Sequence, residues 1–130
     1  MVPNLGRWLA ACAVLLAPAS ALALERVSLP DELRLGTVQV ARPAGPADAV
    51  LFLLSDRSGW SDDLAAVAEE LAGRGVAVIG VNLPDWLGRA GADASDGDCH
   101  YLAGDLEDAS QYLQRSWGGS HYRTPVIAGV

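Results

Sequence analysis

Three apolar runs stand out along the chain and predict strands, and the first two predict buried ones. They cover residues 49–54, 76–81 and 125–130, and Val38 to Val40, after Gly36, indicates a further short strand. Apolar runs of this length are typical of strands covered on both faces of a parallel sheet. We therefore expect four strands, while residues 25–39 otherwise show a mixed pattern.

Two segments between these runs have the apolar spacing of amphipathic helices. In the first, Ser61 is a favoured N-cap residue, and two acidic residues follow in the first turn, where the helix dipole favours anions. The second is expected over residues 105–117. Glycines follow both segments and end the helices. The residues expected on the buried sides are Leu64, Val67, Ala68 and Leu71 in the first helix and Leu106, Ala109, Leu113 and Trp117 in the second.

The order of these elements is β-β-α-β-α-β, which indicates an α/β domain. Helices that join successive strands require those strands to pair in parallel. Residues 85–100, rich in Gly, Asp and Ala, predict a long loop between the second buried strand and the second helix. We expect one mostly parallel sheet with crossover helices.

Residues 1–23 have the three parts of a secretory signal peptide. Arg7 precedes an apolar stretch at 8–16, and Ala21 and Ala23 form an A-x-A cleavage site. A membrane anchor and lipoprotein processing at Cys12 are the alternatives; the apolar run is short for either. We expect cleavage after Ala23, no transmembrane span afterwards, and a periplasmic protein comprising residues 24–130.

Charge excludes one class of partner and bears on another. The chain has 9 basic residues, all Arg, against 16 acidic ones, and a formal net charge of −7. Nucleic-acid binders carry a basic patch, so no nucleic acid is expected as a partner. A hydrophobic share of 51% excludes a disordered chain. An acidic surface would attract a cationic ligand.

Two strand ends are candidate ligand sites, because open α/β sheets bind ligands beyond the carboxyl ends of their strands. The first is a loop that precedes a helix N-terminus, where backbone N–H groups can hold an oxyanion or a phosphate; a tight strand-to-helix turn is the alternative interpretation. Asp85 and Trp86 follow the next strand and form a secondary pocket candidate or a simple turn. The loop residues are Ser55, Asp56, Arg57, Ser58, Gly59 and Trp60.

No complete catalytic set and no metal or cofactor site is expected in these residues. The acidic loop at 93–100 departs from a calcium loop, since Tyr101 stands where Gly is needed, and Cys99 with His100 makes a poor zinc pair. No serine lies in G-x-S-x-G. A nucleophile elbow would follow the strand at 125–130, so we expect the sequence to stop just before it.

Five segments, in this order, resemble the bacterial virulence factor (AcvB/VirJ) family. They are LFLLSDRSGW at 51–60, AGRGVAVIGV at 72–81, CHYL at 99–102, DLE at 105–107 and YRTPVIAGV at 122–130. The match covers roughly residues 47–130 and is most similar to the N-terminal domain of AcvB-like members. The resemblance implies an α/β-hydrolase-like fold and a periplasmic location.

The resemblance also implies hydrolysis of lysyl-phosphatidylglycerol by the family's active domain, and a link to virulence and type IV secretion. In the family's G-D-G-G-W-type loop, Asp56, Gly59 and Trp60 match, whereas Ser55, Arg57 and Ser58 depart. No catalytic residue is carried over. Two functions are therefore expected: an ester hydrolase acting on an aminoacylated phospholipid, or a non-catalytic α/β domain that binds secretion-system proteins or supports a catalytic domain.

Overall fold

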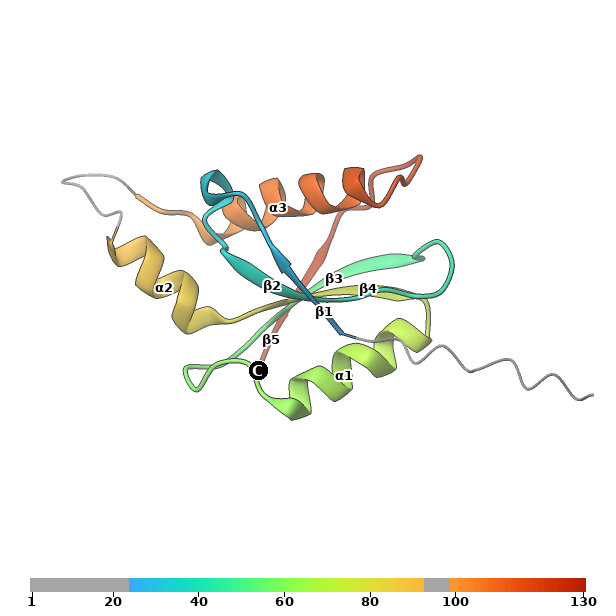
Figure 1. Cartoon of the computed structure of the whole chain (residues 1–130), viewed down its shortest axis with the longest axis horizontal. Helices are drawn as coiled ribbons and strands as arrows, with labels where there is room; N and C mark the ends of the chain where they lie inside the picture. Colours follow the sequence, from blue (N-terminus) through green and yellow to red (C-terminus); the bar gives the residue numbers. More distant parts are fainter. Residues whose placement is uncertain (1–23, 93–98) are drawn as a thin grey trace, which may run out of the picture.

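Helices on both faces of a five-stranded sheet give the chain an α/β fold (Figure 1). The computed structural model describes residues 24–92 and 99–130, so the expected signal peptide lies outside the described residues. The elements in chain order are β1 (Glu25–Ser28), the 3-10 turn η1 (Asp31–Leu33), β2 (Thr37–Ala41), β3 (Ala49–Leu54), α1 (Asp62–Gly73), β4 (Val76–Val81), α2 (Leu83–Ala92), α3 (Leu102–Ser116) and β5 (Val126–Gly129).

The sheet has the strand order β1-β2-β4-β3-β5. β3 pairs in parallel with both β4 and β5, and the register places Phe52 between Ile79 and Ile127. The predicted α/β class with parallel strands and crossover helices is confirmed. At the other side of the sheet, β2 runs antiparallel to β4, and β1 runs antiparallel to β2.

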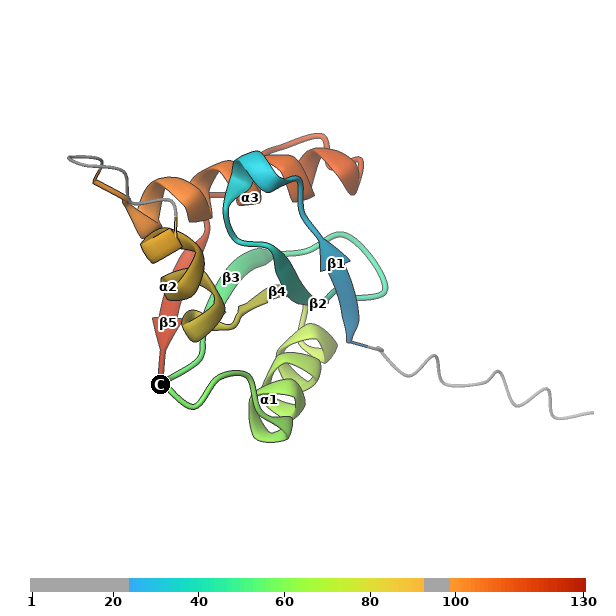
Figure 2. The same cartoon turned by 60° about the vertical axis from the view of Figure 1, so that its left-hand side comes forward.

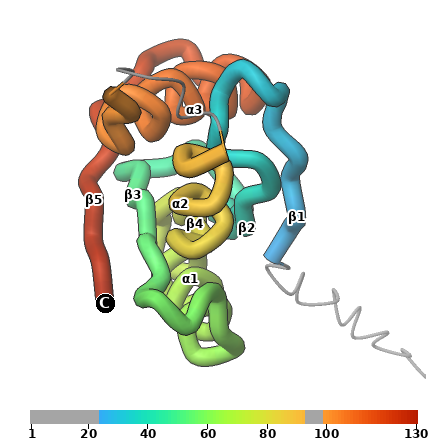
Figure 3. The backbone as a smooth tube through the Cα atoms, turned by 90° about the vertical axis from the view of Figure 1, so that its left-hand side faces the viewer, coloured from blue at the N-terminus to red at the C-terminus, as the bar shows by residue number. Residues whose placement is uncertain are grey.

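The helices cover the sheet from opposite sides (Figures 2 and 3). On one face, α1 packs its buried Leu64, Ala68 and Ala72 against Leu53 and Val78 of the central strands. On the other face, α2 and α3 enclose a larger cluster whose members are Leu29, Leu35, Val38, Val40, Val50, Phe52, Ala77, Ile79, Val81, Trp86, Leu106, Ala109 and Leu113. Both faces of the central strands are thereby removed from water, as the apolar runs predict.

α1 begins at the predicted N-cap, but the residues on its buried side differ in part from those predicted. The Ser61 hydroxyl accepts a hydrogen bond from the Leu64 N–H at 3.3 Å, which confirms the N-cap. Val67, however, is 44% exposed, so its predicted burial is wrong. The buried row is Leu64, Ala68 and Ala72. At 100° per residue, Val67 lies about 100° from the centre of that row, at its margin.

The predicted loop at 85–100 is wrong over its first half, because residues Leu83–Ala92 form α2. Gly88 and Gly91 weaken the helical signal of this segment. Burial of Trp86 in the core cluster compensates for that weakness, and only tertiary packing reveals it. Residues 93–98, the acidic part of the expected loop, lie outside the described residues. β1 was not expected; its exposed polar residues are typical of an edge strand.

A hydrogen bond connects α2 to α3. The buried Trp86 indole donates through Nε1 to Asp105 Oδ2 at 2.8 Å. Asp105 lies in the first turn of α3, where its negative charge also interacts favourably with the positive end of the helix dipole. This bond fixes the orientation of α2, whose N-terminus carries the residues that follow β4.

Replacing Asp105 with Asn should lower the free energy of unfolding by about 1 kcal/mol, because the indole then loses an ionised acceptor. Asp108→Asn, on an exposed position of the same helix, is the matched control and should change it by less than about 0.5 kcal/mol. Urea unfolding measures both. Equal stabilities for the two variants would show that the Trp86–Asp105 bond does not hold α2.

Candidate functional site

The carboxyl ends of β3 and β4 bring two predicted segments together. Leu54 and Val81 are register partners at the ends of these parallel strands, so the loop after β3 lies beside the turn into α2. Gly129 of β5 pairs with Leu54 on the other side. Figures 1 and 2 show the end of the chain close to the β3–α1 loop. This edge is where open α/β sheets bind ligands.

Ser55 joins the two segments. It is 2% exposed, and its N–H donates to the Val81 carbonyl at 3.0 Å. Its hydroxyl accepts from the Leu83 N–H at 2.9 Å and donates to the Asp56 carbonyl at 3.0 Å. The hydroxyl of Ser55 is therefore engaged in holding the β3–α1 loop to the start of α2.

Asp56 closes the loop on itself. Its carboxylate accepts from the Ser58 N–H at 2.8 Å, and its carbonyl accepts from the Gly59 N–H at 3.2 Å. Arg57 and Ser58 are exposed at the tip. Because two N–H groups of the loop are used inside it, they are not free to hold an oxyanion or a phosphate.

Gly59 and Trp60 turn the chain towards α1 and cover β4. Gly59 has φ +91°, a left-handed conformation that favours glycine. The Trp60 ring lies directly on Gly80, where an added Cβ would clash with the ring. Two buried polar atoms here, Trp60 Nε1 and Asn82 Oδ1, have no hydrogen-bond partner among the described residues.

A hollow of about 280 Å³ opens at this edge. Trp60 and Asp85, from the two predicted segments, both line it, and Asn82 lies between them in the chain. Arg26 and Asp85 give it one basic and one acidic side chain. Trp86 points elsewhere: it is buried against α3 and does not line this hollow. The lining residues are Arg26, Thr37, Gln39, Trp60, Asn82 and Asp85.

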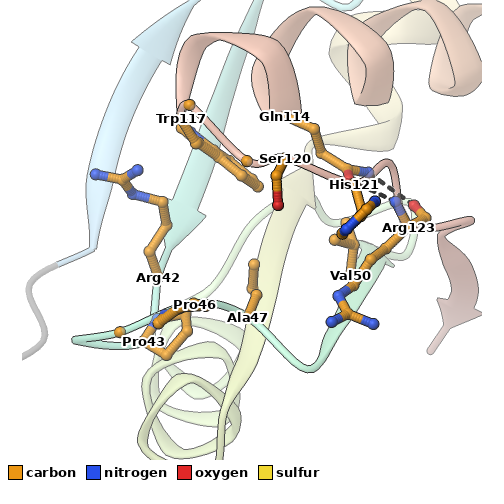
Figure 4. A pocket seen from close by; sticks show the side chains of 14 residues that line it. Arg42, Pro43, Pro46, Ala47, Val50, Gln114, Trp117, Ser120, His121 and Arg123 are labelled. Atoms are coloured by element: carbon orange, nitrogen blue, oxygen red, sulfur yellow. Dashed lines mark hydrogen bonds between the residues drawn. The ribbon is translucent and has the colours of Figure 1, made fainter.

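Both histidines of the chain lie away from the buried Ser55 hydroxyl. The Nδ1 of His100 contacts the guanidinium of Arg34, which follows η1. His121 lies at the opposite end of the central strands (Figure 4). Among residues 24–92 and 99–130 no group of three His, Cys, Asp or Glu side chains has the arrangement of a metal site. Cys99 is exposed and unpaired within the same ranges.

A second cavity, of about 420 Å³, lies near the amino ends of β3 and β4 (Figure 4). The turn before β3 and the segment between α3 and β5 form its walls. Sequence reasoning missed it, because Arg42, Gln114 and Arg123 are far apart in the chain and each resembles an ordinary surface residue. The lining residues are Arg42, Pro43, Gly45, Pro46, Ala47, Val50, Ala77, Gln114, Trp117, Gly118, Gly119, Ser120, His121 and Arg123.

The segment between α3 and β5 also contains Tyr122, whose phenol has a raised pKa. Burial raises the pKa of the Tyr122 phenol, and its hydrogen bond to Glu107, at 2.9 Å, acts in the same direction, while a hydrogen bond with Ser110 opposes them. Tyr122 therefore remains a neutral donor to Glu107. This contact ties the segment before β5 to α3.

Comparisons with known proteins assign no family to the chain. No family model and no curated protein matches the chain. Among solved structures, the chain is similar to an alpha-beta serine hydrolase homologue from Coxiella burnetii, with 17% identity and a TM-score of 0.39. The similarity covers 82% of this chain and 50% of that one, so this chain spans about half the length of its neighbour. No helix in the described ranges is long and apolar enough to cross a membrane.

Replacing Ser55 with Ala should lower the free energy of unfolding by about 1–2 kcal/mol, because the partly buried Leu83 N–H loses its acceptor. Ser58→Ala, an exposed change in the same loop, should cost less than about 0.5 kcal/mol. Chemical denaturation of the two variants tests this. If Ser55→Ala is as stable as Ser58→Ala, Ser55 does not brace the loop.

Replacing Gly80 with Ala should destabilise the protein by about 1–3 kcal/mol, because the new methyl group must displace the Trp60 ring. Gly88→Ala has open space around its Cβ and lies inside α2, so it should be neutral or stabilising. Melting temperatures and tryptophan fluorescence follow the two changes. A Gly80→Ala variant with unchanged stability and spectrum would contradict the stacked position of Trp60.

Proposed function

We propose that this chain is the ligand-binding part of an exported, α/β-hydrolase-like protein of the AcvB/VirJ type, acting in the periplasm. The observation that supports it is the hollow at the carboxyl edge of β3 and β4. Trp60, Asn82 and Asp85 line it, and Asp85 adds an exposed charge; two buried polar atoms of these residues, Trp60 Nε1 and Asn82 Oδ1, have no partner among the described residues. A concave site lined by polar and charged side chains favours a polar ligand.

The ligand that we propose is an aminoacylated phospholipid headgroup, with lysyl-phosphatidylglycerol as its representative. The lysyl group is cationic, and Asp85 offers it an exposed carboxylate at the rim of the hollow. The net charge of −7 adds a long-range attraction to cationic groups. The indole face of Trp60 is an additional partner for an ammonium group.

Binding without hydrolysis is the activity that the geometry favours for these residues. Ser55 is buried with its hydroxyl engaged, and His100 and His121 lie on other parts of the fold. Partner proteins of a secretion system are the alternative ligands of such a non-catalytic domain. Ester hydrolysis of the same lipid is the second candidate, favoured by the exposed Ser58 before the N-terminus of α1.

Vesicle binding tests the proposal. The full chain should sediment with phosphatidylglycerol vesicles that contain lysyl-phosphatidylglycerol more strongly than with vesicles that lack it. Asp85→Asn should weaken this preference about two- to fivefold, as expected for an exposed ion pair, and the matched Asp108→Asn should leave it unchanged. Free lysine measured in the same samples separates binding from hydrolysis.

Equal binding to both kinds of vesicle would overturn the proposed ligand. Release of lysine above the rate in buffer, lost in Ser58→Ala, would favour the hydrolase over the binding domain. Retention of the full preference in Asp85→Asn would place the headgroup outside the hollow at the carboxyl edge.

A further inference from the structure

The cavity near the amino ends of β3 and β4 is positively charged, in contrast to the chain as a whole. Arg42, His121 and Arg123 line it, and none of its 14 lining residues is acidic. The chain carries 16 acidic residues against 9 basic ones, so a concave surface without a carboxylate is unusual for it. A cavity of this charge attracts anions.

The two arginines of the cavity, Arg42 and Arg123, are not neutralised by ion pairs among the described residues. The one ion pair among the described residues joins Arg74 to Glu70, on α1. Arg42 and Arg123 are exposed and make no ion pair within the same part of the chain. A guanidinium group offers a planar fork of donors that matches the oxygens of a phosphate or a carboxylate.

The segment that carries His121 and Arg123 is held in place by α3. The buried Gln114 side chain donates to the Arg123 carbonyl and accepts from the Arg123 N–H, each at 2.8 Å. These two bonds fix the backbone of Arg123 as a strand partner would. The position of its side chain at the cavity therefore follows from the fold and not from a loose loop.

The rest of the cavity is apolar and aromatic. Val50 and Ala77 are buried residues of the central strands, and Trp117 lies beside them at the end of α3. The Arg42 guanidinium lies 5.5 Å from the centre of the Trp117 ring, which places it over that ring. Figure 4 shows Arg42 and Trp117 on one side of the cavity and His121 and Arg123 on the other, with Ser120 between them.

We propose that this cavity binds a phosphate monoester that carries an apolar or ring-shaped substituent. The phosphate lies at Ser120, His121 and Arg123, and the substituent lies against Val50 and Trp117. A phosphate dianion has three terminal oxygens, which suit a hydroxyl, an imidazole and a guanidinium together better than the two oxygens of a carboxylate do. Arg42 adds charge from the far side of the Trp117 ring. The site is distinct from the carboxyl edge and does not depend on the function proposed for it.

Calorimetric titration of the full chain with phenyl phosphate tests the proposal. We expect saturable binding at one site, tighter than that of inorganic phosphate, which lacks the ring, and tighter than that of benzoate, which lacks the third oxygen. Arg123→Gln should weaken binding roughly tenfold or more, as loss of a charged hydrogen bond does. Arg42→Gln should have a smaller effect of the same sign. Rising ionic strength should weaken binding as well.

Two matched variants make the result specific. Arg89→Gln removes an exposed arginine of α2, and Arg57→Gln removes one at the carboxyl edge; both should bind phenyl phosphate as the unmodified chain does. Loss of binding in Arg57→Gln with full binding in Arg123→Gln would overturn the proposal. Absence of saturable binding, or benzoate binding as tightly as phenyl phosphate, would overturn it too. None of these outcomes bears on the preference for lysyl-phosphatidylglycerol.

Discussion

The parallel pairing of β3 with β4 is the constraint on which the rest of the structure depends. Its six register pairs run from Ala49 and Val76 to Leu54 and Val81. Residues 77–81 of β4 are all buried, so both faces of the strand must be covered. α1, the crossover that parallel pairing requires, covers one face, and α2 and α3 cover the other. The loops that bound the carboxyl-edge hollow are consequences of this arrangement.

Elements whose signal is local could be predicted from the sequence. The apolar runs gave β3 and β4 because strands buried on both faces cannot contain polar residues. α1 was found through its N-cap and its spacing. α2 was missed because two glycines weaken its local signal. Its packing depends on distant residues: Trp86, Leu83 and Ala90 contact the core cluster, and Trp86 donates to Asp105. β1 was missed because an edge strand buries little and so has no apolar pattern.

The candidate sites divide in the same way. The loop from Ser55 to Trp60 could be found because it follows a predicted strand and precedes a predicted helix. The role of Ser55 could not, since its partner Leu83 is 28 residues away. Arg42, Gln114 and Arg123 line one cavity only because α3 returns across the sheet, so their spacing in the sequence does not predict that cavity. Composition also gave no sign of it, because an acidic chain gives no reason to expect a cavity lined by two arginines and no carboxylate.

The two concave sites are separated by the length of the central strands, which makes them electrostatically independent. Six residues of extended chain span about 20 Å, and the screening length at physiological salt is about 8 Å. The carboxyl-edge hollow carries both signs of charge, Arg26 and Asp85, whereas the charged side chains of the other cavity are the arginines Arg42 and Arg123. Coupling between them would have to pass through β3 and β4 themselves. Because these strands are packed on both faces and cannot shift without disturbing both cores, we expect the two proposed sites to be independent of each other.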